Sequence, residues 1–154
     1  MNIQPFGGVT KKQIAMIEQE YSITLPLAYK KFLMSVGGGC VELDDKNSIL
    51  IPDLQEKVAV EVLYGYGIQE KNADLSTYMD MLADDLWDNT VIIGDSIEHG
   101  LFVLIGEDGE NDDAGAVYYW DDSYVFDQSD DENNTYWVAD SFTEFLQMLN
   151  GETN

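Results

Sequence analysis

The sequence predicts an α+β protein: a single domain with a mainly antiparallel central sheet and helices packed against it. The first observation is the unbroken apolar run at residues 101–105, which lies between Gly100 and Gly106. A run of this length is typical of a strand that is covered on both faces. Residues 91–95 and 116–121 flank it through short glycine-containing loops, which favours antiparallel pairing in a meander. Helical apolar spacing near both ends of the chain supplies the helices.

Two helices are expected before the sheet. Thr10 and Gln13 have the spacing of a capping box, and the apolar spacing that follows predicts a helix over residues 11–21. Pro26 suits a first helical turn and Gly37 a helix end, which predicts a second helix between them. Its core-facing side chains are expected to be Leu25, Tyr29, Phe32, Leu33 and Val36.

The middle of the chain predicts short strands and a third helix. Residues 40–43 and 48–51 are candidate strands across an Asp/Lys/Asn turn, and residues 58–64 are a further candidate. A helix is expected over residues 75–87, with Asp74 or Ser76 near its start. Its acids stand toward the middle and end of the helix: Asp80, Asp84, Asp85 and Asp88. Negative charge near a helix C-terminus interacts unfavourably with the helix dipole. Something other than helix stability therefore favours these acids.

After the meander, residues 123–126 have the pattern of a short strand, followed by an acidic loop, DQSDDENN, and by a strand at residues 136–139. Ser141 and Glu144 then predict a second capping box at the start of an amphipathic closing helix, which stops near Gly151. The chain of 154 residues is expected to form one domain, residues 1–154, with a core at about 10–149.

The charge is distributed unevenly along the chain. The formal net charge is −23, from 30 acidic residues and 7 lysines, and arginine is absent. Residues 1–71 carry nine acids and all seven lysines, whereas residues 72–154 carry 21 acids and no lysine. The second half therefore predicts a strongly negative surface. Nucleic acid and anionic membrane are disfavoured as direct partners, because phosphate binding normally requires basic side chains.

The single cysteine bears on the cellular compartment. Cys40 can form no intramolecular disulfide, which favours a reducing environment. No apolar segment has the length of a signal peptide or a membrane span. We therefore expect a cytoplasmic protein, with Cys40 as a small buried side chain.

Residues with catalytic or metal-binding chemistry are few. His99 is the only histidine, and we expect it in a turn beside Gly100 rather than in a catalytic triad. A zinc site requires clustered His and Cys side chains, and neither acidic loop matches an EF-hand. Thirty acids guarantee chance carboxylate pairs, and no spacing singles out a glycosidase pair. The sequence thus predicts no enzyme, no metal and no cofactor, with a calcium-dependent protein or a carboxylate hydrolase as an alternative.

Three blocks taken together resemble the SUKH superfamily, which groups bacterial toxin-immunity proteins with the yeast Smi/Knr cell-wall regulators. The first is LPLAYKKFLMSVGGG at residues 25–39; the second comprises VIIGDS, GLFVLI and GAVYYWDD within residues 91–122; the third is VADSFTEFLQML at residues 138–149. Departures from the family pattern are His99 before Gly100 and the DQSDDENN loop. The resemblance implies a SUKH-like α+β fold with no catalytic residues to carry over, and it leaves the partner-contact surface unassigned.

Charge and resemblance together predict an immunity protein that binds and neutralises a cognate polymorphic toxin, with a basic nuclease as the favoured toxin, through its acidic surface. The alternative is a non-catalytic cytoplasmic scaffold or regulatory module of the Smi/Knr type, acidic chiefly for solubility. The oligomeric state stays open. The expected toxin-contact residues are acids of the two loops with nearby aromatic and acidic side chains: Glu107, Asp108, Glu110, Asp112, Asp113, Tyr118, Trp120, Asp121, Asp122, Asp130, Asp131 and Glu132.

Overall fold

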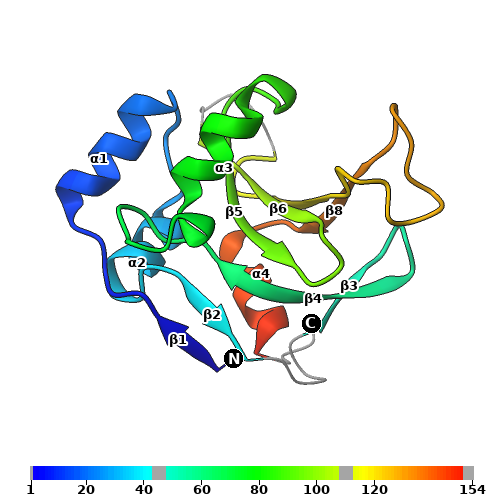
Figure 1. The fold of residues 1–154 in the computed structure, drawn as a ribbon, viewed down its shortest axis with the longest axis horizontal. Helices are drawn as coiled ribbons and strands as arrows, with labels where there is room; N and C mark the ends of the chain where they lie inside the picture. Colours follow the sequence, from blue (N-terminus) through cyan, green and yellow to red (C-terminus); the bar gives the residue numbers. More distant parts are fainter. Residues whose placement is uncertain (1, 43–47, 108–112, 151–154) are drawn as a thin grey trace.

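The computed structural model describes residues 2–42, 48–107 and 113–150. In these residues the chain forms four α-helices and one eight-stranded antiparallel sheet, which confirms the α+β fold class (Figure 1). The strands are β1 (Ile3–Pro5), β2 (Gly39–Val41), β3 (Ser48–Ile51), β4 (Glu56–Leu63), β5 (Thr90–Ser96), β6 (Leu101–Ile105), β7 (Val117–Trp120) and β8 (Thr135–Ala139). The helices are α1 (Lys11–Glu20), α2 (Leu27–Ser35), α3 (Leu75–Leu82) and α4 (Phe142–Leu149), with 3-10 turns η1 (Lys71–Ala73) and η2 (Ala83–Asp85).

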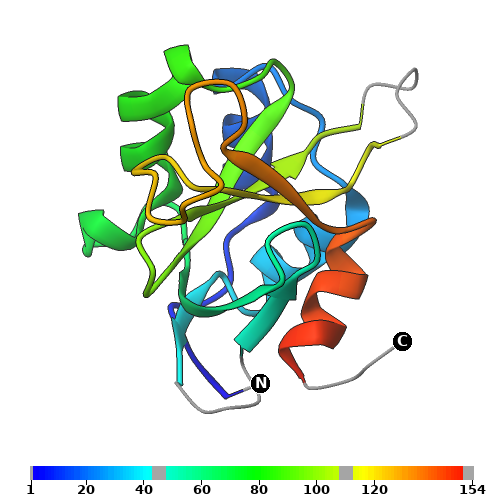
Figure 2. The same cartoon turned by 90° about the vertical axis from the view of Figure 1, so that its right-hand side faces the viewer.

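The sheet runs in the order β1-β2-β4-β5-β6-β7-β8, with β3 also paired to β4. All five residues of β6 are buried, as expected for a strand covered on both faces. On one face, the Phe102 ring lies 5.3 Å from the Phe145 ring of α4. On the other face, Leu101 and Val103 line hollows beside α3. Figures 1 and 2 show α3 and α4 on opposite sides of the sheet.

The helix starts follow the side-chain chemistry that the sequence predicts. Thr10 Oγ1 accepts from Gln13 N over 3.1 Å and Gln13 Oε1 accepts from Thr10 N over 2.9 Å, so the first capping box is confirmed. At α4, Ser141 Oγ accepts from Glu144 N over 3.1 Å, but Glu144 Oε2 accepts from Asp140 N instead of Ser141 N. α4 packs onto α2 through Phe142, whose ring centroid lies 5.0 Å from that of Tyr29.

Several details differ from the sequence-based predictions at the outer edge of the sheet. β2 and β3 both exist, but each pairs with β4: Cys40 lies opposite Val62, and Ser48 opposite Ala59. The eight-residue β4 is long enough to take both strands along one edge, while residues 43–47 lie outside the described residues. Cys40 is exposed, so the prediction of a buried thiol was wrong. β1, which carries Pro5 in a three-residue strand, was not predicted.

The short strand predicted over residues 123–126 is absent from the described structure, and a turn stands in its place. The backbone N–H groups of Val125 and Phe126 donate to the Asp121 carboxylate, each over 2.9 Å, so they cannot donate to a neighbouring strand. Tyr124 also adopts a φ of 53°, outside the extended region.

The predicted third helix is α-helical only as far as Leu82 and continues as η2. Within the described residues, we find no helix of the length and apolarity needed to cross a bilayer.

Candidate interaction site

The structure describes two of the five acids predicted to contact a partner in the first acidic loop. Glu107 and Asp113 are exposed. The Glu107 N–H donates to Thr24 O over 2.8 Å, which ties this end of the loop to the segment between α1 and α2. Asp108, Glu110 and Asp112 lie outside the described residues, so their contribution stays a prediction.

The acids of the second loop are exposed but ordered by local hydrogen bonds. Asp130 Oδ1 accepts from Glu132 N over 2.9 Å and from Asn133 N over 2.8 Å. Asp131 Oδ1 accepts from the Tyr124 hydroxyl over 2.8 Å. The loop therefore presents its carboxylates in a defined arrangement.

Asp121 is a correction to the predicted contact set, because its side chain is fully buried. Besides the two backbone N–H groups named above, its carboxylate accepts from Ser129 Oγ over 2.6 Å. A carboxylate that holds three donors inside the protein stabilises the loop after β7 and is not offered to a partner. Its neighbour Asp122 is only half-buried and faces a hollow.

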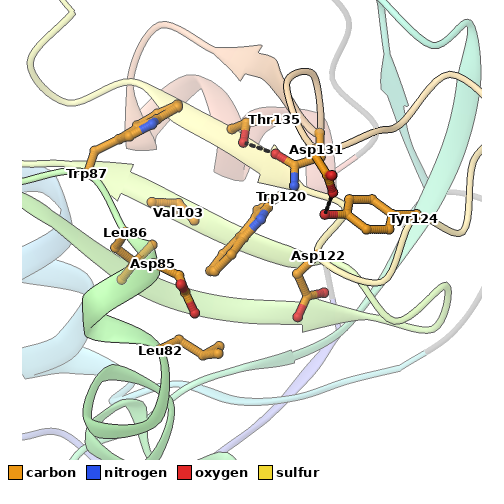
Figure 3. A pocket seen from close by; sticks show the side chains of 11 residues that line it. Leu82, Asp85, Leu86, Trp87, Val103, Trp120, Asp122, Tyr124, Asp131 and Thr135 are labelled. Atoms are coloured by element: carbon orange, nitrogen blue, oxygen red, sulfur yellow. Dashed lines mark hydrogen bonds between the residues drawn. The ribbon is translucent and has the colours of Figure 1, made fainter.

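This hollow has a volume of about 450 Å³ and lies between α3 with η2 on one side and the loop after β7 on the other (Figure 3). Its floor includes Val103 and Trp120, and Trp87 and Tyr124 stand at the rim, 50% and 47% exposed. Tyr118 lies outside the lining, with its ring edge-on to that of Trp87 at 5.3 Å. The lining residues are Leu82, Asp85, Leu86, Trp87, Val103, Trp120, Asp122, Tyr124, Asp131, Asn134 and Thr135.

A second hollow of about 270 Å³ adjoins the first, because Leu82 and Asp122 line both. We refer to the two together as the α3 groove. In its lining, all of it drawn from described residues, every charged side chain is acidic, and neither lysine nor arginine is present. The second hollow is lined by Glu61, Tyr64, Tyr78, Met81, Leu82, Asp95, Ser96, His99, Leu101 and Asp122.

Two carboxylates of the α3 groove lack part of the hydrogen bonding that they can make. Burial raises the pKa of Asp95 to about 6, and the charge of Glu61 acts in the same direction, while a hydrogen bond from Tyr64 lowers it. Burial also raises the pKa of Asp122, as does the charge of Asp121. Within the described residues, the Oδ1 atom of each carboxylate is covered and accepts no hydrogen bond. A buried acceptor without a donor is unfavourable, so both carboxylates favour an added donor.

The groove brings together residues that sequence reasoning placed apart. Of the predicted contact residues, Trp120, Asp122 and Asp131 line it, whereas Glu107 and Asp113 do not. Asp85 and Trp87, which follow α3, were not included in the predicted set. The unfavourable placement of acids near the end of this helix was the available signal for Asp85.

The described residues offer little else for chemistry. No group of three or more His, Cys, Asp or Glu side chains in them is placed to hold a metal ion. His99 is exposed in the turn between β5 and β6, with a φ of 72°, as expected for a turn residue. The carboxylates and aromatic rings of the α3 groove are suited to binding a cationic group.

A comparison with protein families gives a match over most of the chain. The model of the SMI1 / KNR4 family (SUKH-1) matches residues 8–148. This span contains α1 to α3, all but the last residue of α4, the meander and the whole α3 groove. No curated protein matches the chain.

Proposed function

Because the chain belongs to the SMI1 / KNR4 family (SUKH-1), we propose that it is an immunity protein that binds and neutralises a cognate toxin in the cytoplasm of the producing cell. Membership supports an immunity-protein role or a regulatory role of the Smi/Knr type. The observation that favours the first is the α3 groove, a concave surface with acidic and aromatic lining. Such a surface suits a cation-rich protein partner.

The charge distribution supports the same partner class. Residues 72–154 carry 21 acids and no lysine, so their combined field accelerates encounter with a basic protein. A nuclease is the favoured toxin, because a cleft that binds phosphates is rich in cationic side chains. The immunity protein then acts by covering that cleft.

The contact surface that we propose is revised from the sequence-based set. Trp120, Asp122 and Asp131 contribute from the groove, and Asp130 and Glu132 from exposed positions on either side of Asp131 in the chain. Asp85 and Trp87 are added to it. Asp121 is removed because it is buried. The acids of the first loop and Tyr118 stay in the proposed surface as predicted: Glu107, Asp108, Glu110, Asp112, Asp113 and Tyr118.

Co-expression with toxin domains encoded beside the gene tests this function. We expect one such domain to arrest growth alone, to be neutralised by this protein, and to be retained by it in a pull-down from purified components. Adjacent toxin domains that bind this protein but stay active would contradict neutralisation. Absence of any binding would instead favour the regulatory role.

Association kinetics test the electrostatic part of the proposal. With a purified toxin domain, the association rate constant should fall by about tenfold or more between low and high ionic strength, whereas the dissociation rate constant should change less. An association rate that is indifferent to salt would exclude steering by the acidic surface.

A further inference from the structure

The carboxylates of the α3 groove lack a counter-charge within the described part of the chain. The one ion pair found there joins Lys30 to Glu18, and neither residue lines the groove. Asp85, Asp122 and Asp131 stand around one hollow, and Glu61 and Asp95 line the next. Bringing acids together without cations is unfavourable, and a bound cation would relieve the repulsion.

A cation would be stabilised most strongly at the junction of the two hollows, because carboxylates of both hollows lie around it. Asp122 lies there and is half-buried. Its Oδ1 is enclosed and accepts no hydrogen bond from the described residues, so a donor from outside meets the part of the carboxylate that stays exposed. Trp120, which lies in the hollow next to it, is only 9% exposed (Figure 3). A donor that reaches Asp122 is therefore shielded from water by the aromatic floor, which strengthens its hydrogen bond.

The lining distinguishes among cations. Leu82 and Leu86 form an apolar wall beside the acids, and Val103 lies in the floor, which suits the aliphatic stem of a long side chain. The rings of Trp87, Trp120 and Tyr124 suit a flat, weakly hydrated cation. A guanidinium group has these properties and can donate to a carboxylate in a bidentate manner, whereas an ammonium is more strongly hydrated.

We propose that the α3 groove receives an arginine side chain of the partner protein, with the guanidinium at Asp122 and the stem against Leu82 and Trp120. This inference rests on the proposed function, since it names the group through which the toxin is recognised. Arginine at the centre of an interface, in a desolvated pocket, is a frequent hot spot.

The groove can be tested without the toxin by titrating the isotopically labelled protein with Nα-acetyl-arginine amide and following the indole N–H signals by NMR. We expect saturable shifts of the Trp87 and Trp120 signals in the range of about 1 to 20 mM. Trp137 is an internal reference, because it lies outside the groove and its Nε1 donates to Asp140 Oδ1 over 3.0 Å. The neutral analogue Nα-acetyl-citrulline amide, at matched ionic strength, should give shifts at least fivefold smaller.

A pair of variants assigns the site. Asp122→Asn keeps the shape of the side chain and should raise the apparent dissociation constant at least fivefold. Asp53→Asn, at an exposed position outside the groove, removes the same charge and should leave the apparent dissociation constant within twofold of the wild-type value. The inference is overturned if the arginine and citrulline compounds give equal shifts, if no saturable shift occurs, or if both variants weaken binding equally.

Toxin rescue separates this inference from the proposed function. The variant Asp85→Asn/Asp122→Asn/Asp131→Asn should lose affinity for a neutralised toxin by 100-fold or more. The control Asp53→Asn/Glu56→Gln/Glu70→Gln removes equal charge at exposed positions away from the groove and should lose less than tenfold. If both triple variants behave alike while the wild type protects, the groove inference fails and the immunity function stands. If the wild type protects against no adjacent toxin, the function fails, whatever the arginine titration shows.

Discussion

The hydroxyl of Tyr64 donates a hydrogen bond to Oδ2 of Asp95 over 2.8 Å. The Tyr64 ring is also stacked on the Tyr78 ring of α3, with centroids 4.2 Å apart and planes 4° from parallel. The residue that follows β4 therefore joins α3 to a carboxylate on β5. The stability of this junction depends on the protonation state of Asp95.

Lowering the pH should stabilise the protein through Asp95. Burial raises the pKa of this group from 3.8 to about 6 in the folded state, so the folded state holds the proton more tightly than the unfolded chain. The contribution of Asp95 to the free energy of unfolding therefore rises as the pH falls through about 6 toward 4, and is lost as the pH rises through 6. Asp95→Asn should be more stable than the wild type at neutral pH and nearly equal to it near pH 4. Urea unfolding across this range measures both, and parallel curves would contradict the assignment.

Replacing Tyr64 by Phe should destabilise the protein in a pH-dependent manner. The substitution keeps the ring stacked on Tyr78 but leaves the ionised Asp95 without its hydroxyl donor. At neutral pH we expect a loss of about 1 to 3 kcal/mol in the free energy of unfolding. Below the pKa of Asp95 the loss should shrink, because a neutral carboxyl needs the donor less. Urea unfolding at two pH values gives the comparison, and an equal loss at both would show that the hydroxyl acts on something other than the charge.

Asp121→Ala should destabilise the protein by about 2 to 4 kcal/mol, because it leaves three donors of the loop after β7 without their acceptor inside the protein. Asp130→Ala is the matched control: this carboxylate also accepts two backbone hydrogen bonds, but at an exposed position where water replaces it. We expect the control to cost less than about 1 kcal/mol. Thermal and urea unfolding measure both variants, and similar losses would show that the burial of Asp121 contributes little.

Salt should raise the melting temperature. The chain carries a formal charge of −23, and Lys30 with Glu18 is the one ion pair found in its described part, so repulsion outweighs specific attraction. Screening between about 10 and 150 mM sodium chloride should raise the melting temperature by a few degrees, which corresponds to about 1 kcal/mol for a chain of this size. Calorimetry with sodium chloride and with choline chloride distinguishes screening from sodium binding. A fall in melting temperature would indicate that ion pairs dominate.

Most of the fold could be predicted because its signals are local. The apolar run from Leu101 to Ile105 is β6 without an error at either end. Thr10 and Ser141 mark the starts of α1 and α4, because their hydroxyls accept backbone N–H groups three residues away. Such signals require only neighbouring residues, so they are visible in the sequence.

The strand partners of β2 and β3 could not be predicted from such local signals. A turn-like segment between two short strands favours a hairpin, but both strands pair with β4, which takes them at different places along its eight residues. The burial of Cys40 was misjudged for a separate reason. The alternation along β2 buries Gly39 and Val41 and turns the residue between them outward.

The groove needed the tertiary structure. Asp85 and Trp87 stand more than thirty residues before Asp122 in the chain, and only the packing of α3 on the sheet brings them to one hollow. Asp121 and Asp122 are adjacent acids with opposite roles, because the path of the loop after β7 decides which carboxylate it encloses. The distribution of acids in the sequence locates the acidic half of the chain, but it does not show that Asp121 is enclosed while Asp122 lines the groove.

The order of the strands in the sheet has a consequence for synthesis on the ribosome. Apart from β1, which is made first, and β3, each strand lies beside one that the ribosome has already made, so the sheet can grow as the nascent chain emerges. Phe142 of α4, in contrast, packs on Tyr29 and Phe32, more than a hundred residues upstream. These two rings lack their contact with Phe142 until α4 has been synthesised, and a product truncated before α4 would leave them open to aggregation and to proteases.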